Sequence, residues 1–237
     1  MSNMNVLFRR LSTAVVCASV GWAATSGSSY MNPKLATGEF EVHGTCVMPA
    51  EGKLSKLGMK GNEGMSKESE AWSAALQGVV ESHLRVAGVQ VLPSGMSPEE
   101  LEKKPELQQV VLKLQEKYDS ALAQIDKHPK DTRKARFSLG DEVTLLPCAA
   151  NADTLVYVNG HGQVLTGGKK AFGLLVAGPS ASTAFLTLSF VDAKSGDVMA
   201  YLRLLNNGKF VNDSEKAYGN RLDKLFKKMN LGNARRK

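Results

Sequence analysis

Acidic residues are missing from the start of the chain. The first of the 23 Asp and Glu residues is Glu39, whereas Arg9 and Arg10 precede a mostly apolar run from Leu11 to Ala24. A short positive region, an apolar region and small residues, in that order, are typical of a secretory signal, so we expect residues 1–23 to be cleaved off. The run is short for a membrane-spanning helix. A mitochondrial presequence is the alternative, because Arg, Ser and Thr are present without acids.

Export predicts a location in the periplasm or elsewhere in the bacterial cell envelope. A lipid anchor at Cys17 is not expected, because Val16 is larger than the small residue that usually precedes a lipidated cysteine. Of the net charge of +7, two positive charges come from Arg9 and Arg10. The remaining mild excess is not by itself the footprint of a nucleic-acid-binding protein, and we expect no nucleic-acid partner.

Cysteine is scarce. Only Cys46 and Cys148 stand outside the expected signal, and two cysteines of an exported chain could pair. Cys46 lies toward the C-terminal end of an expected strand at 40–48. Cys148 precedes a later strand, expected at 154–158, that we predict to run parallel to the first. This direction places the two residues at opposite edges of the sheet, beyond the roughly 7 Å Cα limit for a bridge. We therefore predict two buried thiols.

Histidine is scarce too, and its spacing gives no metal site. The four residues are His43, His83, His128 and His161, and none has a partner at metal-ligand spacing. The sequence HGTC at 43–46 is a lone His-x-x-Cys without a second half. His83 lies on the apolar face of an expected helix and is predicted to be a packed core residue. No metal ligand and no cofactor are expected.

Nucleotide-binding and esterase motifs are incomplete. A phosphate-binding loop ending in Gly168-Lys169 would need glycine where Gln163 stands and a hydroxyl where Lys170 stands. The sequence GPSAS at 178–182 lacks the final glycine of an esterase nucleophile elbow. We predict no catalytic and no cofactor-binding residues, and the glycine-rich stretch is interpreted as a connection between strands.

Asp192 and Asp197 flank a small, turn-prone centre. In a calcium loop that begins at Asp192, position 3 would be a cation, Lys194, and position 12 would be Arg203. Two strand-like runs meet here, and Ser195 with its following glycine suits a turn. The sequence therefore predicts the corner of a hairpin.

The pattern of apolar residues predicts one α/β domain. With 237 residues, 43% hydrophobic and 22% charged, the chain is long enough to bury a sizeable core. Strands are expected at 40–48, 89–93, 154–158, 184–192 and 198–205, and helices at 66–87, 97–104 and 105–128, with a short helix before the strand at 154–158. A closing helix is expected to carry one apolar stripe that packs on the sheet, made of Tyr218, Leu222, Leu225, Phe226 and Met229. Early βαβ crossovers need parallel pairing and the late hairpin needs antiparallel pairing, so we expect a single mixed sheet with packed helices.

The domain boundaries follow changes in composition. Residues 24–38 are small and polar and are expected to be a flexible lead-in. The α/β domain is expected at 39–230, with a glycine-marked loop after 48, and a basic tail at 231–237. Residues 171–190 hold no charge, and their Gly, Pro, Ser and Thr content favours two apolar strands over a membrane helix. A membrane-contacting hairpin or an oligomer contact is the alternative.

Three stretches carry a resemblance to a known family. They are AGVQV at 87–91, ADTLVYV at 152–158 and VDAKSGDV at 191–198. With the signal-like start, they resemble bacterial envelope proteins whose α/β domain is like that of the curli-secretion channel lipoprotein and the N-terminal domain of the Tol-system translocation protein. The resemblance covers roughly residues 40–228 and implies a non-enzymatic role in assembly or partner binding.

The function expected from the sequence is that of an exported, non-catalytic envelope protein. It would bind an envelope protein partner or self-associate, with possible peripheral membrane contact. A membrane-associated oligomer or secretion component, using residues 171–190, is one alternative, and a hydrolase of unrecognised type is the other.

Overall fold

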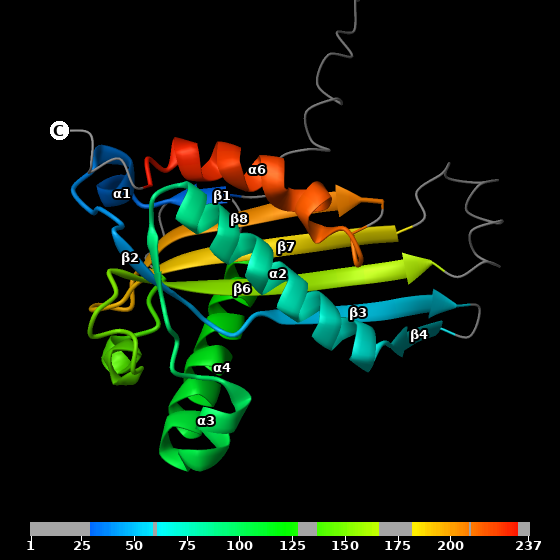
Figure 1. Ribbon diagram of the computed structural model, residues 1–237, viewed down its shortest axis with the longest axis horizontal. Coiled ribbons are helices and arrows are strands. Elements are labelled where there is room, and N and C mark those ends of the chain that lie inside the picture. Colours follow the sequence, from blue (N-terminus) through cyan, green and yellow to red (C-terminus); the bar gives the residue numbers. More distant parts are fainter. Residues whose placement is uncertain (1–28, 59–60, 128–136, 166–181, 209, 232–237) are drawn as a thin grey trace, which may run out of the picture.

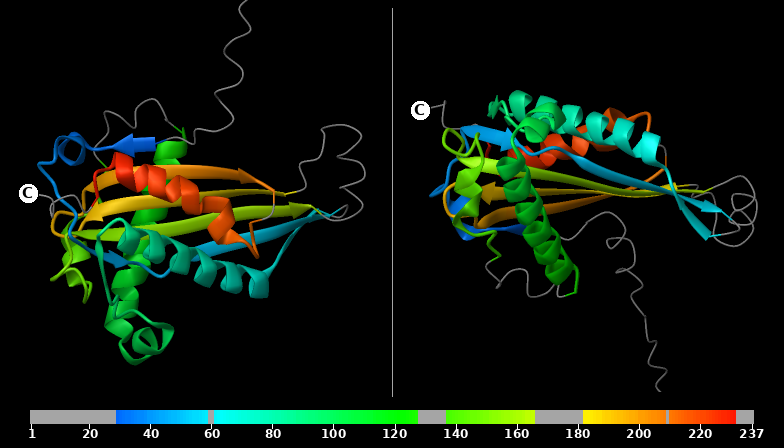
Figure 2. Two further views of the ribbon diagram at one scale, coloured as in Figure 1. Left: turned by 45° about the horizontal axis from the view of Figure 1, so that its top comes forward. Right: turned by 90° about the horizontal axis from the view of Figure 1, so that it is seen from below.

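Eight strands form one mixed sheet with helices on both faces (Figure 1, Figure 2). The computed structural model describes residues 29–58, 61–127, 137–165, 182–208 and 210–231. The strands are β1 (Ser29–Met31), β2 (Gly44–Val47), β3 (Glu51–Gly58), β4 (Gly61–Gly64), β5 (Gln90–Leu92), β6 (Thr154–Leu165), β7 (Ser182–Asp192) and β8 (Val198–Asn207). The helices are α1 (Pro33–Thr37), α2 (Ser66–Val86), α3 (Pro98–Lys103), α4 (Pro105–Lys127) and α6 (Ser214–Lys228), with a 3-10 helix η2 (Asp141–Leu145). The predicted α/β class with a single mixed sheet is confirmed.

The long strand β6 organises the sheet. The strand order is β1-β8-β7-β6-β2-β5, and β3 follows β2 along the same side of β6, with β4 beyond it. Strands β2, β3 and β6 run parallel, as do β2 and β5, which confirms the early βαβ crossover. Strands β7 and β8 form the predicted antiparallel hairpin.

Local signals set the helix ends as expected. Helix α3 begins with the capping box of Ser97 and Glu100. Helix α2 is followed by Gly88, whose φ of 87° is the left-handed conformation that suits glycine after a helix. Strand β5 follows at once, lies at the sheet edge and is only partly buried.

Regular structure extends beyond the predicted elements at two places. Residues 29–37 form β1 and α1 where a flexible lead-in was expected, because β1 pairs with β8 and Asn32 caps α1. Residues 51–58 and 61–64, expected to be part of a loop, form the antiparallel strands β3 and β4, and β6 continues past 158 to Leu165.

Close packing of α2 explains why glycines lie in these strands. A Cβ at Gly160 would lie within 3 Å of the Trp72 and Leu76 side chains, and one at Gly52 would be 3.0 Å from Trp72. Glycine therefore lets the helix approach the sheet backbone here, rather than marking a turn.

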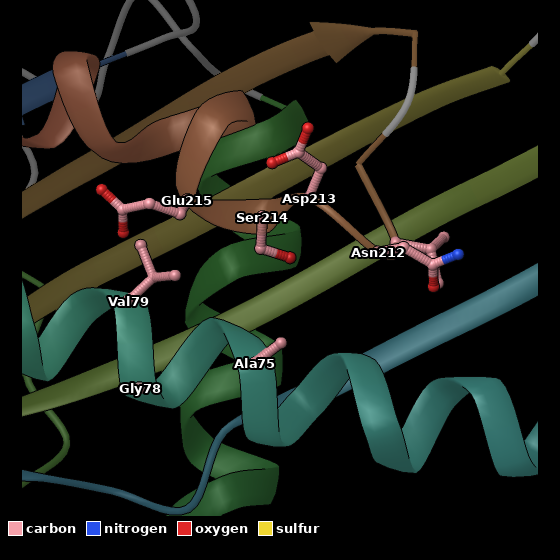
Figure 3. Close-up of a pocket in the computed structure, with 8 residues that line it drawn as sticks. Ala75, Gly78, Val79, Asn212, Asp213, Ser214 and Glu215 are labelled. Atoms are coloured by element: carbon pink, nitrogen blue, oxygen red, sulfur yellow. The ribbon is translucent and has the colours of Figure 1, made fainter.

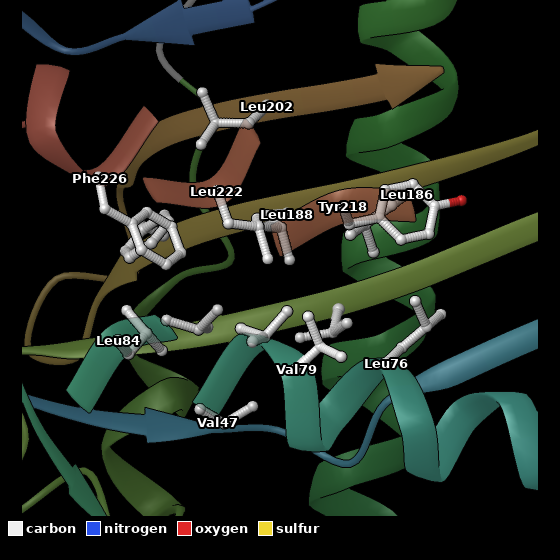
Figure 4. Close-up of a cluster of buried hydrophobic side chains, with 14 of the residues drawn as sticks. Val47, Leu76, Val79, Leu84, Leu186, Leu188, Leu202, Tyr218, Leu222 and Phe226 are labelled. Carbon is white, nitrogen blue, oxygen red and sulfur yellow. The ribbon is translucent and has the colours of Figure 1, made fainter. Parts of the chain in front are cut away.

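Helices α2 and α6 cover one face of the sheet (Figure 1, Figure 4). The side chains Tyr218, Leu222 and Phe226 of α6 and Met229 just after it are buried, and Leu225 is half-buried. The predicted apolar stripe of the closing helix is therefore confirmed as a core element. Phe226 meets Phe190 of β7 edge to face, with 6.0 Å between ring centroids.

Helix α4 packs on the opposite face, over one end of the sheet (Figure 2). Tyr118 of α4 stacks on Tyr157 of β6, with 4.4 Å between ring centroids, and shares a 2.9 Å hydrogen bond with the Ser189 hydroxyl. Tyr118 and Tyr157 lie at the edge of a second buried cluster, which also includes Leu114, Leu155 and Val191.

The prediction that Cys46 and Cys148 stay apart is wrong. The two residues form a disulfide, with Cα atoms 6.1 Å apart. The predicted parallel direction of β2 and β6 is correct, but β2 has only four residues, so Cys46 lies close to both of its ends. After η2, residues 147–151 turn back over the second cluster and bring Cys148 onto the same face as Cys46.

The predicted hairpin corner is confirmed at Asp192. Its carboxylate accepts hydrogen bonds from the Lys194 amide and the Ser195 hydroxyl, each 2.9 Å, and its amide donates to the Asp197 carbonyl. Gly196 has a φ of 74° and lies against Gly140, where a Cβ would come within 2.1 Å of a carbonyl oxygen. The side chain of Asp192 thus stabilises the turn through hydrogen bonds within it.

Part of the uncharged stretch 171–190 forms an inner strand of the sheet. Residues 182–190 are in β7, paired on both sides, which confirms the later of the two predicted strands. Residues 171–181 lie outside the described part. Among the helices of the described ranges, none has the length and apolar character needed to cross a membrane.

Candidate functional site: the open end of the sheet

On the sheet face that carries α4, the described helices reach only as far as Tyr157 (Figure 2). Because strand side chains alternate between faces, the register of four strands aligns every second residue in rows across this face. No helix of the described residues lies over these rows (Figure 2). The three rows beyond Tyr157, from the covered end outward, are Glu51–Asn159–Thr187–Arg203, Lys53–His161–Phe185–Leu205 and Ser55–Gln163–Thr183–Asn207. We call these rows the open face.

The two faces of the same strands differ sharply in chemistry. The α2/α6 face presents apolar side chains, among them Leu54, Leu186 and Leu188, which are all buried. The open face presents three basic side chains, the Glu51 carboxylate, the apolar side chains of Phe185 and Leu205, and amides and hydroxyls. Exposure increases outward, from the buried Asn159 to the exposed Gln163. Asn159 and Thr187 of the innermost row are buried, whereas His161 and Gln163 are exposed, so it is the outer two rows that carry exposed polar side chains.

A cleft of about 410 Å³ lies on the open face. Its lining includes Lys53, His161, Gln163, Phe185 and Arg203, which come from β3, β6, β7 and β8. Four separate strands of one sheet thus hold these side chains in fixed positions.

Cations and one aromatic ring define the electrostatics of the cleft. The Arg203 guanidinium lies over the Phe185 ring, 4.4 Å from its centroid, in a cation–π contact. The Lys53 ammonium group forms an ion pair with the carboxylate of Glu51, the acidic residue of the three rows, at 3.1 Å. Desolvation in the cleft lowers the pKa of His161; Lys53 and Arg203 lower it further, and Glu51 and Asp119 partly oppose the shift.

The border between the covered and open ends holds a buried tyrosine. Tyr157 is 2% exposed, and its hydroxyl has no hydrogen-bond partner among the described residues. Burial raises the pKa of the phenol, so it stays protonated at physiological pH. The Tyr157 ring lies at the inner end of the open face, next to the row that contains Asn159.

A second polar cluster joins α2 to α6. His83 is buried, as predicted, but it is also ion-paired: Nδ1 lies 2.5 Å from the Asp223 carboxylate and Nε2 lies 2.9 Å from the Glu215 carboxylate. Burial opposes charging of the imidazole, but the hydrogen bonds and charges of Asp223 and Glu215 prevail and raise the pKa of His83. Because Asp223 and Glu215 belong to α6 and His83 to α2, the cluster links the two helices.

A cleft of about 490 Å³ lies beside this cluster, between α2 and the start of α6 (Figure 3). Ala75, Gly78 and Val79 line it from α2, and Asp213 and Glu215 line it from α6 and the residue before it. Its walls carry acidic rather than basic groups, in contrast to the open face.

The other residues considered from sequence take separate places. His43 is exposed and pairs with Glu41 at 3.0 Å, and Cys148 is in the disulfide. His128, the pair Gly168-Lys169 and most of the GPSAS segment lie outside the described residues. Within the described ranges, no group of three His, Cys, Asp or Glu side chains is arranged to hold a metal ion.

Sequence reasoning missed the open face because its residues are dispersed. Lys53 stands in a stretch interpreted as a loop, and His161 and Gln163 stand in a stretch interpreted as a glycine-rich connection. The available signal was that Gly160 and Gly162 alternate with the polar residues His161 and Gln163. A period of two is typical of a strand, and glycine on one side of it indicates close packing on that face.

Comparisons with known proteins found distant structural matches. No protein family matches the chain, and no curated protein sequence matches it. Two structures of the PelC dodecamer from Paraburkholderia phytofirmans, one of them a point variant, are similar over 86% and 87% of this chain and 95% and 99% of theirs. The sequence identities are 10% and 9%, and the TM-scores are 0.37 and 0.38. Likeness at this level carries no functional argument, and the resemblance to the curli and Tol proteins stays a prediction.

Proposed function

We propose that this chain is an exported, non-catalytic protein of the bacterial cell envelope that binds a protein partner through the open face. The observation that carries the proposal is the polar, cationic end of an inner sheet face, with its cleft of about 410 Å³. Burying such a face in apolar packing would leave its amides and charges unsatisfied, whereas a polar partner can pair with them.

Two features support export. The N-terminal sequence has the order of a secretory signal. The disulfide between Cys46 and Cys148 is a bond that persists in oxidising compartments such as the periplasm and is rare in the reducing cytosol. The disulfide, which was not expected from the sequence, therefore supports the same compartment as the signal.

Intact mass of the protein purified from its native host tests export. The expected mass lacks residues 1–23 and corresponds to a molecule with one disulfide. A mass that includes residues 1–23, with both thiols reduced, would contradict the export proposal. Pelleting with membranes in high salt would instead favour the membrane-associated alternative.

Photocrosslinking tests binding through the open face. A photoreactive amino acid replaces Gln163 in the full chain, and in a control it replaces Lys56, which is exposed on the same sheet but points to the opposite face. We expect a specific envelope adduct with the first variant that is weakened when Arg203 is also changed to Gln. Equal adducts at both positions would contradict a role for the open face.

A further inference from the structure

We propose that the outward face of α6 holds the protein against an anionic phospholipid surface through its lysine side chains. The inference rests on the envelope location in the proposed function, but it concerns a different surface from the open face. It follows from the position, the pairing and the chemistry of these lysines.

The lysines gather on the side of α6 that faces away from the sheet. A helix turns by about 100° per residue, which fixes where each side chain projects. Three lysines and one asparagine lie within about 80° of one another, opposite the buried stripe: Lys216, Asn220, Lys224 and Lys227. All four are exposed, and Lys228 is exposed at their flank. We call the four lysines at 216, 224, 227 and 228 the lysine face.

The acids nearest to the lysine face have other partners. Asp223 and Glu215 of α6 both pair with His83 of α2. On α2, Glu81 pairs with Arg85. None of the four lysines forms an ion pair with a residue in the described ranges. Their positive charge is therefore left for an external anion.

The lysine face lies on the outside of the molecule. Helices α2 and α6 form the outer layer on their side of the sheet, and α4 lies on the opposite side (Figure 2). The contact between His83 and Asp223 places α2 beside α6 and not over it. Because a helix rises about 1.5 Å per residue, the lysine face extends for about 18 Å along this surface.

The chemistry of the lysine face favours a lipid surface over a protein or a nucleic acid. Lysine carries a flexible point charge, which suits a diffuse anionic surface, whereas arginine suits one fixed carboxylate or phosphate. Lysine is also depleted from protein–protein interfaces. The aromatic rings of α6, Tyr218 and Phe226, are buried, so the lysine face offers no ring on which a nucleic-acid base could stack.

The contact is electrostatic and does not involve insertion. An interfacial amphipathic helix buries its apolar face in the lipid. The apolar stripe of α6 is already packed on the sheet, where Phe226 meets Phe190. We therefore expect an association that salt weakens, because salt screens exposed charges.

Cosedimentation of the processed, disulfide-bonded protein with lipid vesicles tests the proposal. The probes are phosphatidylcholine vesicles that contain either no phosphatidylglycerol or about one third of it, which gives the surface a negative potential. We expect binding to the anionic vesicles only. Raising the salt from about 0.05 M to about 0.5 M should weaken it by about tenfold or more.

Two double variants locate the contact. Lys224→Gln with Lys227→Gln should weaken binding by about 25-fold, because each lysine near an anionic surface contributes a factor of about five. The matched control is Lys103→Gln with Lys104→Gln, which removes two exposed positive charges at the end of α3. It gives the same net charge and should bind as the parent does. The comparison of the two vesicle types uses the unchanged protein, so a variant that fails to fold does not remove the test.

Four results would overturn the proposal. The first is no binding to the anionic vesicles, and the second is equal binding to both vesicle types, which would indicate insertion. The third is equal weakening by the two double variants, because net charge would then explain the binding. The fourth is full displacement of the vesicles by polyglutamate or by a single-stranded oligonucleotide at a far lower concentration of negative charge, which would identify another class of ligand.

Failure here is distinguishable from failure of the proposed function. If the photoreactive group at Gln163 captures an envelope partner while the anionic vesicles are not bound, the lipid contact is wrong and the binding role of the open face stands. If the vesicles are bound through Lys224 and Lys227 while Gln163 captures nothing beyond the Lys56 control, the lipid contact stands and the role of the open face is wrong.

Discussion

Gly219 of α6 lies directly against His83 of α2. A Cβ at Gly219 would come within 2.8 Å of His83 Nε2 and 2.5 Å of Glu215 Oε1. The ion-paired histidine thus occupies space that the side chain of any residue other than glycine would fill in the neighbouring helix. Helix α6 accepts a residue of poor helix propensity at this point because the contact between the two helices requires it.

We predict that Gly219→Ala destabilises the protein by about 1–3 kcal/mol, as overpacking of a tight contact does. The matched control is Gly78→Ala in α2, where a Cβ meets nothing within 4 Å. That change should stabilise the protein by up to about 1 kcal/mol, because alanine favours a helix. Urea unfolding of both variants measures the difference, and two changes of the same sign would contradict the packing argument.

A second prediction concerns the pH dependence of stability. The pKa of His83 is raised above its ordinary value of 6.5 by Asp223 and Glu215, against the opposing effect of burial. The folded state therefore holds the proton more tightly than the unfolded state. The stabilisation is fully present below pH 6.5 while the carboxylates stay ionised, and it is lost as pH rises through the raised pKa.

Urea unfolding of the parent and of His83→Gln between pH 5.5 and 9 measures the contribution of protonated His83 to the free energy of unfolding. The parent should be more stable than the variant at pH 5.5 to 6, and the gap should narrow at alkaline pH. A gap that widens as pH rises would show that the sign is wrong.

The third prediction concerns the disulfide, which joins residues 102 positions apart. Closing so long a loop restricts the unfolded chain, so replacing both Cys46 and Cys148 by alanine should cost about 2–4 kcal/mol. Urea unfolding with and without a reductant measures the effect. The reductant should destabilise the parent and leave the double variant unchanged; equal stability of the parent in both conditions would contradict the prediction.

The fourth prediction separates a core helix from a membrane helix. Phe226 is buried against Phe190, and Phe226→Ala should cost about 3–5 kcal/mol in urea unfolding. The half-buried Leu225 is the control, and its change to alanine should cost less. An unchanged midpoint for Phe226→Ala together with loss of liposome binding would show that the apolar stripe of α6 acts at a membrane.

Local patterns in the sequence were sufficient for helices α2, α3, α4 and α6 and for the sheet's mixed character, but not for α1. The apolar periods of α2 and α6, the capping box at Ser97 and the hairpin corner at Asp192 depend on interactions within a few residues. The parallel relation of β2 and β6 followed from the order of elements. These features were predictable because neighbouring residues specify them.

Only the tertiary structure decided which distant residues meet. The glycines at 52, 160 and 162 look like loop residues in the sequence. In the structure, Gly52 and Gly160 make room for Trp72 of α2, and Gly162 makes room for Leu54 and Phe210. Cys148 reaches Cys46 because η2 and the following turn fold back over one face, and neither residue carries a local signal of that path. The open face likewise exists only in the register of β3, β6, β7 and β8, because Lys53 and Arg203 share a cleft through strand pairing and not through proximity in the chain.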